Sequence, residues 1–448
     1  MLQDTIAAIS TALGEAAISV VRVSGPQALA VAERVFRTGK PLSELKARQA
    51  YLVSALDSEG GTLDQGLFLL FRGPASYTGE DVIEFHGHGG LLVTQKLLES
   101  LLSAGARSAE PGEFTQRAFL NGKMDLTQAE AVMDLIHAQS TLALKAAHEQ
   151  LGGAIGKEAA ALREELLPVL AHVEAYIDFP EEDISPDTGA TLVAKMDLVL
   201  ERTRRLIDTS EQGRILRHGA RTVICGEPNV GKSSLLNLLL GFERAIVSPT
   251  AGTTRDTIEE IIQVHGIPLR LVDTAGLRAS LDDIERVGIE RTQREVERAD
   301  LILEVVDGSL PPADSQRVIL PPEAESRRIL ILNKADQGVH PDWPEGVALS
   351  CLNNTGVEML RDAIRTVIMR VGSLQADHPI AINARHKTCF ERIVLQVQAA
   401  RAALLEGTAP EYVALDLREA LQSLGEVVGV VDVEQILDVI FSSFCIGK

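Results

Sequence analysis

Apolar and polar residues recur with different periods along the chain and divide it into stretches of different character. Up to about residue 120, short apolar runs such as 17–22 and 65–71 predict strands, and helical spacing at 27–35 and 91–102 predicts helices between them. From about residue 124 to 218, Ala, Leu, Glu and Arg recur with helical spacing. This order predicts a mixed α/β domain followed by a helical one.

Strands alternate with helices from about residue 221 to 370, which is typical of a doubly wound, mainly parallel sheet. Helical spacing returns after Pro379. A helical domain with an α/β domain inserted into it explains this order, because the two ends of a domain usually lie close together. Two independent helical domains are the alternative. The expected fold class is multidomain α+β and α/β. The predicted domains are residues 1–120 (mixed α/β), 121–218 and 374–448 (the two parts of a discontinuous helical domain) and 219–373 (the inserted α/β domain).

Composition then narrows the function classes. The 43 Lys and Arg residues are outnumbered by 63 Asp and Glu, which gives a net charge of −20. This charge excludes attraction of the whole surface to nucleic acid or to an anionic membrane, but not a local basic patch. The cysteines at 225, 351, 389 and 445 form no CxxC pair, which argues against a zinc site or a disulfide framework. No apolar run approaches the ~18 residues that span a bilayer. We expect a cytoplasmic protein with no membrane partner.

The strongest motif is the segment 226–233, Gly-Glu-Pro-Asn-Val-Gly-Lys-Ser, which matches GxxxxGK[ST]. A strand is predicted before it at 221–225 and a helix after it at 234–240, as a phosphate-binding loop requires. Glycines let backbone N–H groups surround phosphates, and the helix N-terminus adds partial positive charge. We expect Lys232 to reach the β- and γ-phosphates and Ser233 to bind magnesium.

Three further motifs follow in the order of a GTPase, each after a predicted strand. The segment 273–276, Asp-Thr-Ala-Gly, offers a carboxylate to magnesium through water and a glycine N–H to the γ-phosphate. In 333–336, Asn-Lys-Ala-Asp, a carboxylate can accept from both N1–H and the amino group of guanine, a donor pair that adenine lacks. The segment 350–352, Ser-Cys-Leu, is placed to contact the other edge of the base. These motifs predict GTP as the nucleotide and a Ras-like P-loop GTPase domain as the inserted domain.

The residue that orients the attacking water is not evident from the motifs. Ras-like enzymes carry a glutamine directly after DxxG, whereas this chain has Leu277 there. Three explanations stay open: no useful hydrolysis, a catalytic group from a partner, or a polar residue elsewhere in the chain. The carboxylates of 281–286 and the hydroxyls of 248–256 are candidates, with Thr254 as a second magnesium ligand and Asn229 adding an oxygen.

These segments together resemble the tRNA-modification GTPases of the MnmE (TrmE) family over essentially the whole length of the chain. The resemblance rests on three separate regions of the sequence. Its segments are 226–234, 252–256 and 273–278 in the inserted domain, and 79–84, 87–90, 111–114, 119–125 and 441–448 outside it.

The resemblance implies a potassium-dependent enzyme. In this family potassium bridges two GTPase domains that dimerise across their nucleotides, and it neutralises charge on the transferring phosphoryl group. By resemblance, Glu285 orients the attacking water through a second water, and Lys232 and Glu285 are the catalytic residues of hydrolysis. The positions that match the potassium contacts are Asn229, Ser248, Thr250 and Thr253. The expected GTP-binding residues are Asn229, Val230, Gly231, Lys232, Ser233, Ser234, Ser248, Pro249, Thr250, Ala251, Gly252, Thr253, Thr254, Asp273, Thr274, Ala275, Gly276, Asn333, Lys334, Ala335, Asp336, Ser350, Cys351 and Leu352.

The resemblance also implies a one-carbon site in the N-terminal domain. This domain of the family binds a tetrahydrofolate derivative (5-formyl or 5,10-methylene) and forms a constitutive homodimer. Arg and Lys suit the anionic tail of a folate, and a carboxylate suits the paired donors of a pterin ring. Cys445 is a further candidate catalytic residue. The alternative is a buried side chain that acts as a small hydrophobic residue, which is commoner for free cysteines. The matching folate positions are Arg22, Glu84, Lys123 and Lys448.

The family implies a reaction and two partners besides the second copy. GTP hydrolysis opens and closes paired GTPase domains, and a carboxymethylaminomethyl group is added to C5 of the wobble uridine of certain tRNAs. An FAD-dependent partner protein, in a heterotetramer, supplies the redox chemistry. The present sequence has no GxGxxG loop opening a βαβ unit that would supply it.

The alternative class is a regulatory or ribosome-assembly GTPase that modifies nothing. Such a protein carries a basic RNA-binding module, and the corresponding stretch here is a predicted helix over 202–221 that contains six arginines. Acidic residues are interspersed there, so a solvated helical face is the simpler interpretation, and the folate positions favour the modification enzyme. The stretch 86–90, His-Gly-His-Gly-Gly, is predicted to be a glycine-rich turn before a helix rather than a metal site.

Overall fold

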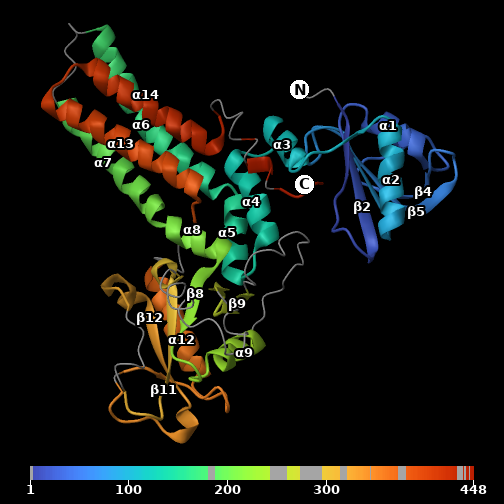
Figure 1. Ribbon diagram of the computed structural model, residues 1–448. Helices are drawn as coiled ribbons and strands as arrows, with labels where there is room; N and C mark the ends of the chain where they lie inside the picture. Colours follow the sequence, from blue (N-terminus) through green and yellow to red (C-terminus); the bar gives the residue numbers. More distant parts are fainter. Residues whose placement is uncertain are drawn as a thin grey trace. The chain divides into compact units, whose positions relative to one another are not determined.

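The structure is a computed structural model that describes residues 4–179, 187–242, 260–272, 295–312, 320–343, 345–371, 380–430, 437, 440–442 and 444–447 (Figure 1). The chain divides into two compact units, Met1–Met133 with Val428–Lys448 and Asp134–Val427. The fold class expected from the sequence is confirmed, since a mixed α/β unit, a helical part and a doubly wound sheet are all present. The four predicted domain ranges stay a prediction.

The first unit is built on a seven-stranded sheet in the order β3-β4-β5-β6-β2-β1-β7. Its pairs are antiparallel except for the parallel pair of β1 with β7. Helices α1 (Ala28–Val35) and α2 (Leu91–Ser103) pack their apolar sides on the sheet, where Phe36 stacks on Phe85 at 4.9 Å between ring centroids. The strands are β1 (Ile6–Ile9), β2 (Ala16–Ser24), β3 (Phe36–Arg37), β4 (Ala50–Leu56), β5 (Thr62–Phe71), β6 (Val82–Gly89) and β7 (Arg107–Ser108).

Residues 86–89 belong to strand β6, so the predicted turn at 86–90 is wrong. The glycines there serve close approach rather than turning. A Cβ added to Gly87 would lie 2.4 Å from Asp64 Oδ2, and one added to Gly66 on the neighbouring strand would lie 2.3 Å from the His86 carbonyl oxygen. The described residues contain no group of three His, Cys, Asp or Glu side chains that could hold a metal ion.

The first unit is completed by segments from both halves of the sequence. Helix α3 (Glu113–Leu120) and the first part of α4 (Leu126–His137) lie in it, together with residues after 428. Phe441 and Phe444 are buried against Leu126 and Met133 of α4, with the two rings 5.1 Å apart. The C-terminal segment is therefore part of the core of this unit.

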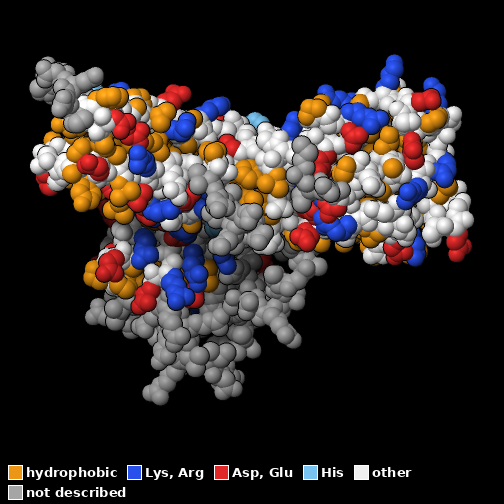
Figure 2. Space-filling model, turned by 90° about the horizontal axis from the view of Figure 1, so that it is seen from above, with side chains coloured by type: hydrophobic (Ala, Val, Ile, Leu, Met, Phe, Trp, Pro, Cys, Tyr) orange, Lys and Arg blue, Asp and Glu red, His pale blue; other side chains and the backbone are white. Residues whose placement is uncertain are grey.

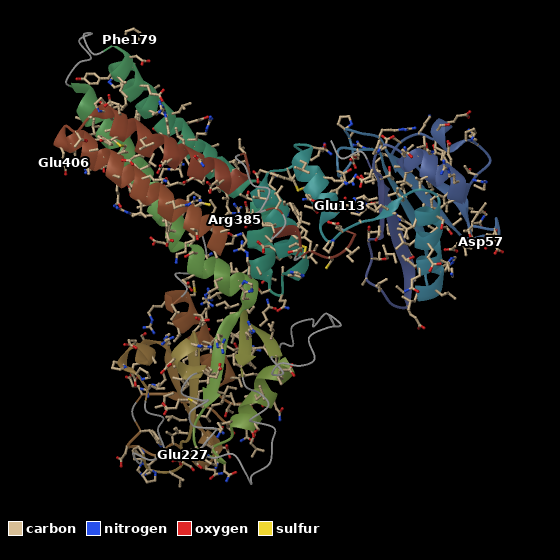
Figure 3. The ribbon with its side chains drawn as sticks, turned by 45° about the horizontal axis from the view of Figure 1, so that its top comes forward. Asp57, Glu113, Phe179, Glu227, Arg385 and Glu406 are labelled. Atoms are coloured by element: carbon tan, nitrogen blue, oxygen red, sulfur yellow. The ribbon has the colours of Figure 1, made fainter. Side chains whose placement is uncertain are left out.

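The helical part of the second unit combines helices that precede and follow the second sheet. Helix α7 (Asp187–Asp208) packs against both α6 (Ala154–Asp178) and α13 (Ala384–Glu406). Arg385 lies at the start of α13 (Figure 3) and donates to the carbonyls of Glu426 and Val427 in the last turn of α14 (Pro410–Val428). The C-terminal end of a helix favours a cation at this place. The remaining helices are α5 (Thr141–Leu151), α8 (Ser210–His218) and α14 (Pro410–Val428). No helix of the described residues is long and apolar enough to cross a bilayer.

The second sheet has six strands in the order β13-β12-β11-β8-β10-β9, all parallel except β9. Arg221 lies in its strand β8, not in a helix as the predicted span 202–221 implied, because the helix ends at His218 before Gly219 with φ of +78°. The strands are β8 (Ala220–Cys225), β9 (Glu260–Val264), β10 (Ile267–Val272), β11 (Leu301–Asp307), β12 (Arg328–Asn333) and β13 (Val347–Ala348), and the helices are α9 (Lys232–Phe242) and α12 (Val357–Val371).

Candidate functional site

Part of the predicted site falls on residues that the structure describes and part does not. The predicted residues outside the described ones are Ser248, Pro249, Thr250, Ala251, Gly252, Thr253, Thr254, Asp273, Thr274, Ala275, Gly276, Glu285 and Lys448, together with Leu277. The described part of the predicted site comprises the phosphate-binding loop, the two base-side segments (333–336 and 350–352) and the N-terminal and C-terminal positions Arg22, Glu84, Lys123 and Cys445.

The phosphate-binding loop connects β8, which lies between β10 and β11, to the first turn of α9. Glycine is required at both ends of the loop. Gly226 has φ of +137°, and a Cβ added there would lie 2.1 Å from the Val305 carbonyl oxygen. Gly231 has φ of +103°, and a Cβ added there would lie 2.1 Å from Asn333 Nδ2. Glycine at these two positions permits the tight backbone path of a loop whose N–H groups surround a phosphate.

Lys232 begins α9 and folds back over the loop. Its ammonium group donates to the carbonyl oxygens of Gly226 at 2.9 Å and Glu227 at 2.7 Å. Burial lowers the pKa of Lys232 below its usual value. A phosphate is a stronger partner for an ammonium group than two neutral carbonyls, so this lysine is placed to transfer to an anion in the loop. Ser233 and Ser234 are exposed in the same helical turn.

Asn333 joins the phosphate-binding loop to the base-side segments. Its Nδ2 donates to the Val230 carbonyl at 2.8 Å, and its Oδ1 accepts from the Cys351 N–H at 3.3 Å. The carboxylate of Asp336 accepts from the Ser350 hydroxyl at 2.6 Å. The structure therefore brings the predicted segments 226–233, 333–336 and 350–352 together at the carboxyl ends of β8, β12 and β13, where open α/β sheets bind ligands.

Two details of this region were not foreseen. Lys334 pairs with Asp307 at 2.6 Å. Asp307 was not predicted from the sequence, although it follows the mostly apolar stretch 301–306 in the way that the other motifs follow their strands. Burial raises the pKa of the Cys351 thiol to about 11, so it is a neutral thiol at pH 7. Leu352 is 81% exposed.

The predicted N-terminal residues Arg22 and Glu84 are brought together by strand register. They face each other across β2 and β6, and the Arg22 guanidinium contacts Glu84 Oε1 at 2.8–2.9 Å. The guanidinium carbon also lies 5.5 Å from the ring centroids of both Tyr77 and Phe114. These two rings were missed because they lie far from Arg22 in the sequence.

The C-terminal segment reaches the same place. The Gly447 carbonyl accepts from Ser10 Oγ at 3.1 Å and from Arg22 at 3.4 Å. The Gly112 N–H donates to the Cys445 carbonyl at 3.4 Å, while the Cys445 side chain is exposed. Lys123 donates to the Pro74 carbonyl at 2.9 Å, in the loop that precedes Tyr77.

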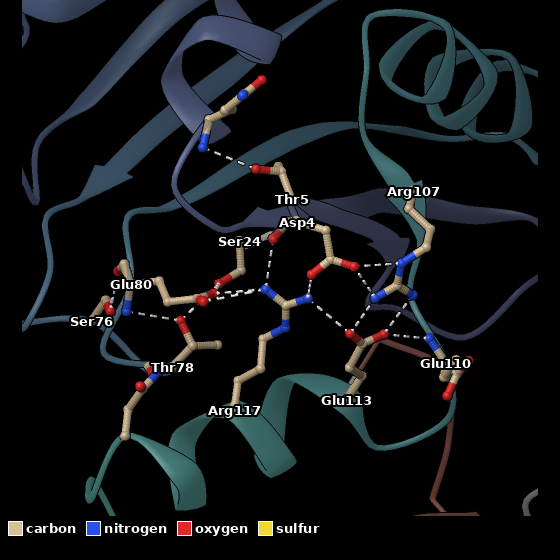
Figure 4. A network of polar contacts seen from close by, with 12 residues as sticks. Asp4, Thr5, Ser24, Ser76, Thr78, Glu80, Arg107, Glu110, Glu113 and Arg117 are labelled. Carbon is tan, nitrogen blue, oxygen red and sulfur yellow. Dashed lines mark hydrogen bonds and ion pairs between the residues drawn. The ribbon is translucent and has the colours of Figure 1, made fainter. Parts of the chain in front are cut away.

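An ion-pair network centred on the buried Arg117 supports this region (Figure 4). Arg117, 1% exposed, donates to Asp4, Glu80 and Glu113 at 2.8–3.2 Å. Glu80 in turn accepts from Ser24, which ends β2, and Glu113 also pairs with Arg107. The network ties the loop 77–80 and α3, which carry Tyr77 and Phe114, to β2, which carries Arg22.

A doubly wound sheet, a GxxxxGKS loop at the carboxyl end of its β8 and an Asn-Lys-Ala-Asp segment bonded to that loop define a P-loop protein that binds guanine nucleotides. Comparison with known protein families assigns the chain to a narrower class. The family model of the MnmE helical domain matches residues 126–445, and the model of the GTP-binding protein TrmE N-terminus matches residues 5–123.

Relatives match over the full chain. The chain is 52% identical over 450 residues to a tRNA modification GTPase MnmE of Akkermansia muciniphila, and the match covers 100% of this chain and 99% of the relative. It is 43% identical to a tRNA modification GTPase MnmE of Geobacter sulfurreducens, and that match covers 100% of both chains. A solved G domain of FeoB from Methanococcus jannaschii covers 33% of this chain and 96% of its own at 24% identity, with a TM-score of 0.24, too low to bear on the fold. The chain belongs to the MnmE family of tRNA modification GTPases. It is a GTP hydrolase that acts in tRNA modification.

Proposed function

We propose that this GTPase is potassium-dependent and acts with an FAD-containing partner. It adds a carboxymethylaminomethyl group to C5 of the wobble uridine of certain tRNAs, using a one-carbon unit from a tetrahydrofolate derivative. GTP hydrolysis drives dimerisation of the GTPase domains and the accompanying conformational change. The observation that carries this proposal is the Arg22–Glu84 pair beside two aromatic rings and the Gly447 carbonyl, a site that a simple GTPase switch does not need.

The phosphate-binding loop supports the proposed cation sites. Ser233 is the proposed magnesium ligand on α9, with Thr254 as the second, and Asn229 is the proposed potassium ligand with Ser248, Thr250 and Thr253. Of these, Asn229 and Ser233 are among the described residues, and both side chains are exposed. Asn229 has φ of +64°, which short polar side chains tolerate. Lys232 serves the phosphates, and Glu285 is proposed to orient the attacking water. Magnesium and potassium would lower the charge that builds up between the phosphoryl oxygens.

The chemistry of the N-terminal site fits a folate. Glu84 Oε1 is engaged by Arg22, whereas the contact recorded for Oε2 within the described part of the chain is a longer one of 3.3 Å to His86, so Oε2 can accept from the paired donors of a pterin. Arg22 and Lys123, with Lys448, provide positive charge for an anionic tail. A tetrahydrofolate derivative bound there would supply the one-carbon unit. The exposed thiol of Cys445 is kept as a candidate catalytic group on the segment that contacts Arg22 through Gly447.

The open side of the first sheet supports the proposed homodimer. Ile18 of β2, Leu52 of β4 and Leu67 of β5 are 59%, 63% and 44% exposed, and Leu52 and Leu67 are paired across their strands. Exposed apolar side chains in neighbouring strands are typical of protein–protein contact surfaces. A second copy of the chain is the proposed occupant of this face.

The charge distribution supports a proposed small share of the tRNA affinity for this chain. Acidic and basic side chains are interspersed on the face drawn in Figure 2, in keeping with a net charge of −20. Arginines of the former candidate basic stretch are paired, Arg202 with Glu158, Arg214 with Asp300 and Arg217 with Asp134. The FAD-containing partner is proposed to add to the tRNA contact.

The test is GTP turnover by the full chain in potassium and in sodium buffer at matched ionic strength. We expect stimulation by potassium of roughly tenfold or more, because a cation at the transferring phosphoryl group replaces an arginine finger, and we expect Asn229→Ala to lose it. Asn353→Ala is the matched control, since Asn353 lies in an exposed turn after the base-side segment. Equal rates in both salts would contradict the proposal and favour a switch activated by a partner.

A further inference from the structure

The carboxyl ends of β11 and β12 carry a second carboxylate beside the base-side segment. Asp307 is the last residue of β11, and in the parallel register it faces Asn333, the last residue of β12. The next residue, Lys334, has φ of +62° and directs its ammonium group to Asp307 Oδ2 at 2.6 Å. The Gly308 N–H donates to the Asn333 carbonyl at 2.8 Å, which fixes the two strand ends to each other.

Asp307 is itself held in place from its other side. The Ser309 hydroxyl and N–H both donate to Oδ1, at 2.6 Å and 3.1 Å. Its side chain is 13% exposed, compared with 35% for Lys334. Burial alone would raise the pKa of Asp307, but the bonds from Lys334 and Ser309 outweigh it and keep that pKa below the usual value. The carboxylate is therefore ionised at neutral pH and is the fixed member of the pair.

We propose that Asp307 is a positioning residue for the guanine base, acting through Lys334. The inference rests on the proposed assignment of 333–336 to the base. The Ser350 hydroxyl fixes the Asp336 carboxylate, which is assigned to the edge of the base. Asp307 fixes the ammonium group of Lys334, the residue assigned to the face of the base. A lysine fixed at its tip presents its four methylene groups as a flat apolar surface, which suits the face of a purine ring. Without the carboxylate, the lysine must be ordered when the nucleotide binds, at a cost in side-chain entropy.

The experiment measures the dissociation constants of fluorescent GDP and GTP analogues for the full chain by stopped-flow fluorescence. We expect Asp307→Asn to weaken binding roughly fivefold, the size of one partly exposed ion pair, mainly through faster dissociation. Lys334→Met, which keeps most of the apolar stem, is combined with it in a double-mutant cycle. In the Lys334→Met background, Asp307→Asn should change the dissociation constant by less than about twofold.

Asp342→Asn is the matched control, because it makes the same charge change on a side chain that is 71% exposed and 3.7 Å from its nearest partner, His340. It should bind like the unchanged protein. Unchanged binding by Asp307→Asn, or additive losses in the double variant, would overturn the inference. Asp336→Asn tests the proposed assignment separately: if it fails to shift preference from guanine to xanthine nucleotides, the segment does not read the base, whatever Asp307 does.

Discussion

At the scale of single residues, Arg117 has the most demanding environment in the first unit. A guanidinium that is 1% exposed is surrounded by Asp4, Glu80 and Glu113, and each carboxylate belongs to a different part of the chain. Removing one member of a buried ion pair leaves the other charge without compensation, which costs more than the pair contributes. Arg117 therefore connects the segments that carry the residues of the proposed one-carbon site.

Arg117→Met should destabilise the first unit by about 3 kcal/mol, the lower end of the cost of breaking a buried pair, because Arg107 still compensates Asp4 and Glu113. Hydrogen exchange of the β1 and β2 amides in the full chain measures this directly, because these strands are joined to Arg117 through Asp4 and Glu80. Arg37→Met is the control, since Arg37 is exposed and donates to backbone carbonyls. Equal protection in both variants would show that the network adds nothing to stability.

The same network gives a pH dependence. Burial alone would raise the pKa of Glu113, but the bonds from Arg107, Arg117 and the Glu110 N–H lower it below its usual value of 4.5. A folded-state pKa below the unfolded one stabilises the fold fully above pH 4.5, and this contribution is lost as pH falls through the lower folded value. Amide protection in β1 and β2 should therefore fall below about pH 4.5, and less steeply in Glu113→Gln. A Glu113→Gln profile parallel to that of the unchanged chain would exclude Glu113 as the source.

At the scale of elements, the C-terminal segment 444–447 completes the proposed folate site. Gly447 has φ of +97°, and a Cβ there would lie 2.3 Å from the Ile9 carbonyl oxygen. Gly447→Ala should displace the segment and weaken binding of 5-formyltetrahydrofolate about tenfold, since strain of 1–3 kcal/mol opposes docking. Isothermal titration calorimetry measures the affinity.

Gly39→Ala serves as the control for this variant, because a Cβ at Gly39 meets nothing within 4 Å. GTP turnover should be unchanged in both variants, since the nucleotide site lies in the other compact unit. Folate binding by Gly447→Ala that equals that of Gly39→Ala would remove the segment from the site.

The elements themselves were largely predictable from the sequence. The apolar runs at 17–22, 65–71 and 221–225 lie within β2, β5 and β8, because alternating or continuous apolar residues leave few other ways to bury them. Residues 86–89 escaped prediction since glycine usually marks turns, whereas here it is needed for close contact between strands. The short motifs predicted that the nucleotide is GTP. The roles of the Arg117 network, Tyr77 and Asp307 were not predicted, because they depend on partners far away in the sequence, which local patterns do not show.

At the scale of the whole molecule, net charge sets what the chain can bind. The chain carries a net charge of −20, and described arginines such as Arg401 and Arg418 are paired to Asp197 and Glu174. We therefore expect few phosphate contacts from the chain alone. The logarithm of tRNA affinity for the chain alone should fall with the logarithm of salt with a slope of magnitude below about 4. Fluorescence anisotropy with labelled tRNA between about 50 and 200 mM salt measures this slope. A short single-stranded RNA is the non-specific control. A slope of about 8–10 would reveal a basic surface that the charge balance hides.

The Ser10–Gly447 bond also has a consequence for biosynthesis. Its two residues are 437 positions apart, so the first unit cannot be completed on the ribosome when its sheet emerges. At 5–20 residues per second, the complete sheet, which ends with β7 at Ser108, waits roughly 17–70 s for the segment that carries Gly447. During that time its incomplete core is exposed to chaperones and proteases, while the inserted GTPase domain is already made. A chain that stops before residue 441 would thus lack the Phe441, Phe444 and Gly447 contacts that complete the first unit.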